Sequence, residues 1–96
     1  MRFEWDEAKS LANQKKHGVS FVEARSVFYE ETALLFDDPD HSEEEQRYLL
    51  VGPGVLGRVL VVVHCWREDD ELIRIVSARK ATRREREAFR TKGGRR

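Results

Sequence analysis

Basic side chains at the ends of two neighbouring strand-like segments carry the groups most able to act on a phosphate. Arg67 closes the segment 58–67, and Arg79 lies near the end of the segment 72–80. A guanidinium presents a planar fork of N–H donors that binds two phosphate oxygens at once. RNA can be cut without a metal if cations stabilise the extra charge on the reacting phosphate while a base and an acid move the protons. Arg67 and Arg79 are therefore candidates for contact with the phosphates of RNA or DNA.

Period-two alternation gives the geometry expected for this pair. In the segment 58–67, one face holds Val59, Val61, Val63, Cys65 and Arg67, opposite Leu60, Val62, His64 and Trp66. In the segment 72–80, one face holds Ile73, Ile75, Ser77 and Arg79, opposite Leu72, Arg74, Val76, Ala78 and Lys80. Arg67 and Arg79 extend their faces beyond the apolar part, so we expect them to meet at one rim. The alternative is that these arginines are solvated strand ends or pair with the acids at 68–71.

The three histidines have different neighbours. His17 follows Lys16 at the end of a predicted helix, where it could act as a general acid or base or could cap the helix. Both interpretations of His17 stay open. His64 lies within an apolar segment and is expected to be packed and hydrogen-bonded. His41 lies in an acidic loop and is expected to be exposed.

Further contacts to RNA are expected around the two arginines. Four basic residues are candidates for phosphate contact: Lys16, Arg74, Lys80 and Arg83. Trp66, next to Arg67, could stack on a base or pack in the core. Trp5 is expected to pack in the core, because a domain of this size needs its large aromatic side chains there.

The spacing of potential ligands does not favour a metal site or another cofactor. The sequence has no His-x-x-x-His pair, no Cys pair and no HExxH motif. The acidic block 37–45 lacks the spacing of an EF-hand loop. We expect this block to be a solvated face or a docking surface for a basic partner, and we expect no metal and no cofactor.

Charge is distributed unevenly along the chain. Residues 72–96 hold ten Lys or Arg and two acids, a local charge of +8, although the whole chain has 18 of each sign. Residues 26–46 hold eight acids and no Lys or Arg. A basic segment of this kind is typical of a surface that binds a polyanion such as RNA or DNA.

Capping signals and hydrophobic periodicity predict the elements that position these residues. Asp6 and Gly18 bound one helix, Ser20 opens a second with the capping-box spacing to Glu23, and Thr82 opens a third over 83–91 with the same spacing to Glu85. Strands are expected at 2–5, 33–36, 47–51, 58–67 and 72–79. Short turns between the last four strands predict an antiparallel sheet in an α+β fold of order β-α-α-β-β-β-β-α.

Length and composition limit the organisation of the chain. Its 96 residues predict a single domain over 1–91, followed by a flexible basic tail at 92–96. The single Cys65 excludes an internal disulfide and fits a reducing cytoplasm. The longest apolar run, 59–63, is too short to cross a bilayer, and the first residues lack the apolar core of a signal peptide.

Three separated blocks resemble the BrnT family of bacterial type II toxins: FEWDEAKSLANQKKHGVSF at 3–21, VVVHCWRE at 61–68 and RIVSARKA at 74–81. They agree with the family in order and spacing, and the resemblance extends to about Phe89. It implies a RelE-like fold and a ribonuclease activity that arrests translation. With that activity implied, Arg67, Arg79 and His17 are the candidate catalytic residues. It also implies neutralisation by a small antitoxin that binds DNA and represses its own operon.

Two classes of function are therefore carried forward. The first is a metal-independent endoribonuclease acting on single-stranded or ribosome-associated RNA in the cytoplasm. The second is a non-catalytic RNA- or ribosome-binding module, or a subunit of an autorepressing DNA-binding complex. For the enzyme we expect an antitoxin that uses acidic or apolar residues against the last strand and third helix. An assembly of two toxins and two antitoxins would contact DNA only through the antitoxin.

Overall fold

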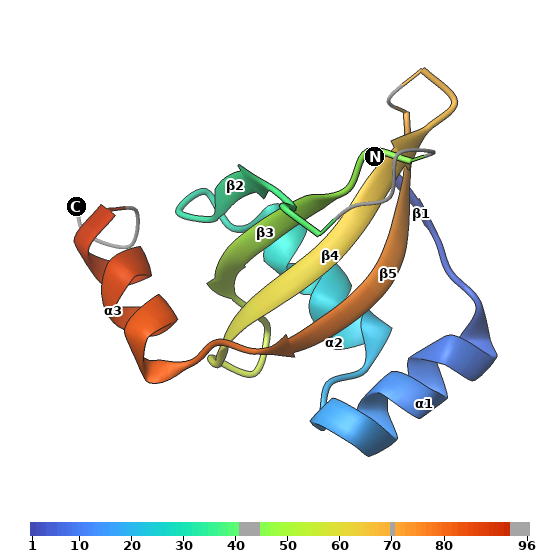
Figure 1. Cartoon of the computed structure of the whole chain (residues 1–96). Helices are drawn as coiled ribbons and strands as arrows, with labels where there is room; N and C mark the ends of the chain where they lie inside the picture. The colour runs from blue at the N-terminus through green and yellow to red at the C-terminus, as the bar shows by residue number, and fades with distance from the viewer. Residues whose placement is uncertain (41–44, 70, 93–96) are drawn as a thin grey trace.

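The computed structural model describes residues 1–40, 45–69 and 71–92 and has the predicted order of helices and strands (Figure 1). The elements are β1 (Arg2–Glu4), α1 (Glu7–His17), α2 (Phe21–Ser26) with a 3₁₀ turn η1 (Val27–Tyr29), β2 (Leu34–Asp37), β3 (Tyr48–Pro53), β4 (Val59–Arg67), β5 (Leu72–Lys80) and α3 (Arg83–Lys92). His41 and residues 93–96 of the predicted tail lie outside the described residues.

The five strands form one mixed sheet in the order β1-β5-β4-β3-β2. The predicted antiparallel pairing is confirmed from β2 to β5, where each strand follows its neighbour through a short connection. β1 is the exception, because it pairs with β5 in parallel, Phe3 opposite Ile73. Between β1 and the rest of the sheet the chain passes through α1 and α2, which is the long crossover that such a pairing requires.

Helix α1 has the predicted caps and is fixed to the sheet by a polar side chain. Asp6 accepts hydrogen bonds from the N–H groups of the first turn, and Gly18 ends the helix in the left-handed conformation. The buried Asn13 donates Nδ2–H to the carbonyls of Val19 and Ala78, at 2.7 and 2.8 Å, and accepts the Ala78 N–H. The C-terminal half of α1 therefore lies against the C-terminal half of β5.

Helix α2 covers the same face of the sheet and supplies much of the core. It lies behind the sheet in Figure 1. Ser20 caps it as predicted, but the carboxylate of Glu23 pairs with Arg58 of the β3–β4 loop instead of completing the capping box. Its apolar side chains pack on the three middle strands, β3, β4 and β5, in one cluster: Val19, Phe21, Ala24, Val27, Leu50, Leu60, Val62, Ile75 and Ala78.

A β-bulge in β5 makes its side chains alternate between the two faces of the sheet differently from the prediction. Val63 pairs with Ser77, but the next residue of β4, His64, pairs with Ile75, so Val76 is an extra residue in β5. The bulge reverses the alternation from that point. Arg74 therefore lies on the same face as Arg79, and Ala78 joins Ile75 in the core, whereas simple alternation predicted the opposite.

The pairing also shows that the predicted meeting of Arg67 and Arg79 is wrong. Arg67 pairs with Leu72 at one end of the β4–β5 ladder, and Arg79 pairs with Val61 near the other end. These two positions are six residues apart in β4, which is about 20 Å along a strand. The prediction failed because β4 and β5 are antiparallel. The last residue of β4 therefore lies beside the first residue of β5, and the last residues of β5 lie at the other end of the ladder.

Helix α3 packs on the sheet face that α1 and α2 leave uncovered. Its contact is small and centres on Phe89, which packs with Val51, Val61 and Ala81. Figure 1 shows α3 beside the sheet at the end where β5 finishes. The open face is therefore covered at one end only.

Candidate active site

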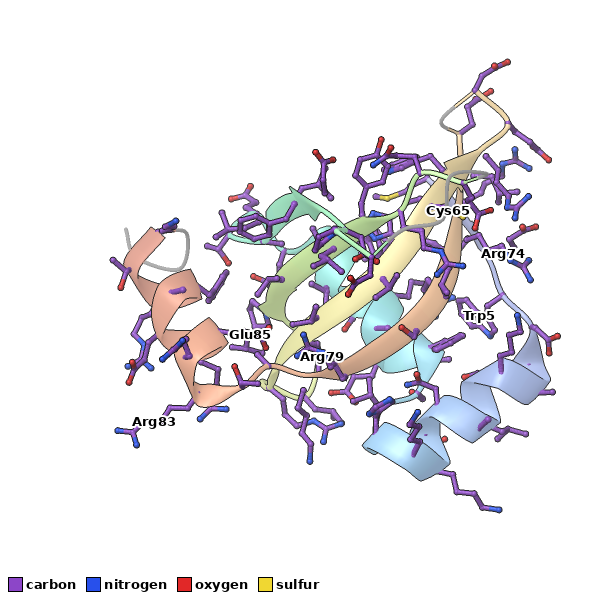
Figure 2. The ribbon with its side chains drawn as sticks, in the orientation of Figure 1. Trp5, Cys65, Arg74, Arg79, Arg83 and Glu85 are labelled. Atoms are coloured by element: carbon purple, nitrogen blue, oxygen red, sulfur yellow. The ribbon has the colours of Figure 1, made fainter. Side chains whose placement is uncertain are left out.

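The predicted basic residues divide into two groups, one at each end of the β4–β5 ladder. Figure 2 shows Arg74 toward the end where β5 begins and Arg79 near the end where β5 finishes, with Glu85 beside Arg79. The register adds Arg67 to the first group and Lys80 to the second. We call them the Arg67 end and the Arg79 end.

At the Arg67 end, carboxylates from distant parts of the sequence neutralise the arginines. Arg67 Nη2 donates to Glu45 Oε2 at 2.9 Å, and its Nε lies 3.6 Å from Glu4 Oε2. Arg74 Nη1 donates to the same Glu4 oxygen at 3.1 Å, and Arg47 lies 3.6 Å from Glu45. These arginines therefore form ion pairs, but with Glu4 and Glu45 and not with the acids of the turn 68–71 that the alternative named; Glu68 pairs with Arg2 instead.

Cys65 lies beneath this network, directly opposite Arg74 in the ladder (Figure 2). It is 1% exposed, and burial raises the pKa of its thiol, with the nearby Glu45 acting in the same direction. A buried, protonated thiol is a poor nucleophile. Cys65 therefore serves packing rather than chemistry.

At the Arg79 end, the central contact is a bidentate ion pair. Arg79 Nη1 and Nη2 donate to the two oxygens of Glu85 at 2.7 and 2.9 Å. The side chains remain 41% and 36% exposed, so the pair is open to solvent. The hydrogen bonds from Arg79 are the main cause that lowers the pKa of Glu85 to about 2. At neutral pH the Arg79 guanidinium is therefore bound to an ionised carboxylate through two parallel hydrogen bonds. The same geometry would bind two oxygens of a phosphate.

The local sequence explains why Glu85 reaches Arg79. Thr82 Oγ1 accepts the Glu85 N–H at 3.1 Å, and the Thr82 N–H donates to Glu85 Oε1 at 2.8 Å, which confirms the predicted capping box. A capping box turns its carboxylate back toward the residue before the helix, and here that position follows the end of β5. Glu85 was absent from the predicted site, although the capping-box spacing that identifies it was visible in the sequence.

Several other predicted residues lie near the Arg79 end. Lys80 is exposed at the end of β5, and Arg83 is exposed in the first turn of α3, 3.5 Å from Glu87. Lys16 and the half-buried His17 close α1, and the next residue, Gly18, accepts a hydrogen bond from Arg58, which precedes β4. The end of α1 therefore lies at the same end of the ladder as Arg79, on the face covered by α1 and α2.

The structure confirms the predicted packing of Trp5 and His64 and places Trp66 away from the two arginines. Trp5 packs against Phe21 edge to face and lies under Arg25, which confirms its predicted core role. His64 is fully buried with its Nδ1 3.3 Å from the Val62 carbonyl, which confirms that it is packed. Trp66 is half-buried near His64, on the face opposite Arg67. It therefore does not share a surface with the two arginines predicted to be catalytic.

An apolar groove opens beside the Arg79–Glu85 pair, between α3 and the open face of the sheet. Its volume is about 220 Å³, and its lining comes from β2, β3, β4 and α3: Leu34, Phe36, Leu49, Val51, Val61, Glu85, Ala88, Phe89 and Lys92. Phe36 is 43% exposed at the sheet edge formed by β2. The groove therefore joins an apolar surface to the basic end of the ladder.

The described residues also bear on two other kinds of site. Within residues 1–40, 45–69 and 71–92, no three His, Cys, Asp or Glu side chains gather in a group that could hold a metal ion. No helix in this part of the chain is long and apolar enough to cross a membrane.

Comparison with known proteins identifies the family. A model of the "ribonuclease toxin, BrnT, of type II toxin-antitoxin system" matches residues 5–85, which is most of the chain. The chain belongs to the BrnT family. It is therefore a ribonuclease toxin of a type II system, with RNA as substrate and an antitoxin as partner. No curated protein matches it.

A solved structure supports the fold. The chain is similar to the Brucella abortus ribonuclease toxin BrnT, with a TM-score of 0.65 and 24% sequence identity. The match covers 86% of this chain and 99% of the Brucella chain. The predicted α+β fold and the resemblance to BrnT toxins are thus both confirmed.

Proposed function

We propose that this BrnT-family toxin cleaves RNA without a metal ion, at the Arg79 end of the β4–β5 ladder. The observation that carries the proposal is the bidentate grip of Arg79 on an exposed carboxylate, because the same fork fits two oxygens of a phosphate. A guanidinium at this position would stabilise the charge that develops on the phosphate in the transition state.

Other side chains at this end suit supporting roles. Lys80, Arg83 and Lys16 are exposed cations that can follow the RNA backbone. His17 is the candidate general acid, because histidine is the side chain most often used for proton transfer in catalysis and α1 ends at the same end of the ladder. Arg67, Arg74 and Trp66 lie too far along the ladder to share the reacting phosphate, so we assign them to outlying contacts with the same RNA.

We further propose that the toxin acts in the cytoplasm, where cleavage of free or ribosome-associated RNA arrests translation. A protein that damages RNA must be silenced in its own host. The antitoxin would do so most directly by covering the Arg79 end with acidic side chains and by placing apolar side chains in the neighbouring groove. The exposed Phe36 and the lining residue Phe89 offer the apolar contact, and Lys92 offers a charged rim.

A DNA-binding antitoxin dimer would hold two copies of this chain. Because such antitoxins bind operators through a two-fold axis, the expected assembly is two toxins and two antitoxins. DNA would then be contacted only by the antitoxin. Co-expression with the neighbouring reading frame, followed by a mass measurement of the purified complex, tests both partner and stoichiometry.

The experiment that tests the catalytic proposal is RNA cleavage by the purified chain, freed of its antitoxin, with and without EDTA. We expect equal cleavage in both conditions. Loss of cleavage in EDTA would overturn the metal-free mechanism. RNA binding without cleavage, in the presence and absence of ribosomes, would instead favour the non-catalytic RNA-binding module.

A further inference from the structure

The Arg79–Glu85 pair joins the two kinds of group that RNA cleavage needs. Cleavage needs a cation at the phosphate and a base at the neighbouring 2′-OH. The candidate cation and a carboxylate are already in contact here, at 2.7 and 2.9 Å. Glu85 comes from a different element than Arg79, and Thr82 holds it independently of that arginine.

We propose that Glu85 is the general base of RNA cleavage, and that the phosphate frees it by taking its place on Arg79. The inference rests on the proposed function, because it assumes that Arg79 binds the reacting phosphate. Glu85 is then a catalytic residue that the free protein keeps inactive.

Displacement by phosphate is feasible because Arg79 has spare donors. A guanidinium carries five N–H groups, and the contacts of Arg79 to Glu85 and to the Lys80 carbonyl account for three. A phosphate can therefore begin to bind at an unused donor before it displaces the carboxylate. The exposure of both side chains leaves room for this approach.

After displacement, the capping box keeps the carboxylate next to the phosphate. The Thr82 N–H still binds Oε1 of Glu85, whereas Oε2 loses its partner, Arg79 Nη2. One oxygen of the carboxylate is thus anchored and the other is available to accept a proton. A base held in this way satisfies the requirement that it lie within hydrogen-bond reach of the group it deprotonates.

The exchange also makes Glu85 more basic. Hydrogen bonds from Arg79 are the largest cause of its low pKa, so their loss raises that pKa, and the nearby phosphate charge raises it further. The other charged group lining the groove beside Glu85 is Lys92, and the sheet residues that line it are apolar. Arg83 and Arg86 on the same helix oppose the rise only in part, because both are exposed to solvent.

The resulting step balances without a further reagent. The 2′-O–H bond breaks, its proton goes to Glu85 Oε2, and the 2′ oxygen forms a bond to phosphorus. The bond from phosphorus to the 5′ oxygen breaks, and that oxygen takes a proton from water. The products are a 2′,3′-cyclic phosphate and a 5′-hydroxyl end.

The test compares Glu85→Gln with the matched variant Glu87→Gln. Both remove one acid from α3, but Glu87 contacts only the exposed Arg83 in the described part of the chain. Single-turnover cleavage of a short single-stranded RNA gives the rate, and DNA of the same sequence, which lacks the 2′-OH, gives the affinity. We expect Glu85→Gln to bind the DNA at least as tightly as the parent and to cut RNA about 100-fold more slowly or worse. Glu87→Gln should stay within about twofold in rate.

Two further measurements separate a base from a structural residue. The parent rate should rise with pH along an acid limb that Glu85→Gln lacks and Glu85→Asp retains. The carboxyl carbon of Glu85, followed by NMR, should titrate at higher pH once the DNA is bound. Circular dichroism and thermal melting check that each variant remains folded.

The outcomes decide between distinct explanations. Parental cleavage by Glu85→Gln would overturn the inference, and faster cleavage with tighter binding would show that Glu85 only shields Arg79. Loss of affinity together with rate, or an unchanged pH profile, would show that Glu85 only holds α3. If the parent protein itself does not cut RNA, the proposed function fails, and this result is separate from the other three.

Discussion

The two ends of the β4–β5 ladder carry similar basic side chains in very different electrostatic settings. At the Arg67 end, Glu4 and Glu45 each pair with two arginines, and they come from β1 and from the segment before β3. At the Arg79 end, residues 79–86 hold Arg79, Lys80, Arg83, Arg84 and Arg86 but only one acid, Glu85. The first end is nearly neutral, and the second keeps an excess of positive charge.

This difference separates arginines that hold the fold from arginines that are available to a ligand. The acids at the Arg67 end connect segments far apart in the sequence, so removing them would loosen β1 and the start of β3. Glu85 instead belongs to a short helix with one buried anchor, Phe89. A ligand can displace that acid without opening the sheet, which makes the Arg79 end the better place for a phosphate.

The largest effect is expected when the central arginine of each end is replaced by alanine. Arg79→Ala should lower RNA cleavage about 100-fold or more, because a charge contact made in the transition state is lost. Arg67→Ala should change cleavage far less and cost at most about 1 kcal/mol of stability, because its ion pairs are partly exposed. Single-turnover rates and chemical denaturation of the two variants measure both quantities. Equal loss of cleavage in the two variants would remove the functional distinction between the ends.

The next largest effect on the cleavage rate is expected from His17, at the end of α1. His17→Ala should slow cleavage roughly 100-fold and remove the alkaline limb of the pH–rate profile if His17 protonates the leaving oxygen. A histidine that only caps α1 would leave the profile unchanged and cost about 1 kcal/mol of stability. Cleavage measured across pH 5 to 9, together with a melting curve, distinguishes these roles. Lys15→Ala, in the same helix turn, is the matched control for loss of a charge.

A smaller effect should appear when the Arg67 end is made to resemble the Arg79 end. The double change Glu4→Gln and Glu45→Gln leaves Arg67 and Arg74 without their carboxylate partners. We expect tighter RNA binding with a steeper dependence on salt, because more cations can meet phosphates. The cleavage rate at saturating RNA should stay near that of the parent. A gain in cleavage rate would show that Arg67 can reach the reacting phosphate.

Much of the fold followed from local sequence signals. The caps at Asp6, Gly18, Ser20 and Thr82 are where the spacing predicted them, and every predicted strand is present within a few residues. These signals are local hydrogen bonds and apolar periodicity, and neither depends on the rest of the molecule. The parallel pairing of β1 with β5 was not predicted, because it joins segments about 70 residues apart.

The site was harder to predict for the same physical reason. The bulge at Val76 has no glycine to mark it, and it changes the face of Arg74 relative to Arg79. The partners of Arg67 come from positions 4 and 45, which no periodicity brings together. Glu85 was the exception, since its capping box with Thr82 was predicted and the end of β5 is only a few residues away. Combining these two predictions would have placed a carboxylate beside Arg79.

The smallest expected effect is on the pH dependence of stability. It comes from His64, which lies beside the bulge between the two ends of the ladder. Its ring is fully buried against Phe28 and Tyr48, and Nε2 has no hydrogen-bond partner in the described structure. Burial lowers the pKa of His64 below 6.5. At a pH between the two pKa values, His64 is protonated in the unfolded chain but not in the folded one. Its contribution to the free energy of unfolding is therefore complete above about pH 6.5 and is lost as the pH falls below that value. For one proton the slope cannot exceed about 1.4 kcal/mol per pH unit.

Melting temperatures between pH 8 and pH 5 measure this dependence. His64→Leu should flatten it, whereas His17→Ala should leave most of it in place, because His17 is only half-buried at the end of α1. A parent protein whose stability does not change across this range would show that His64 accepts its proton without leaving the core.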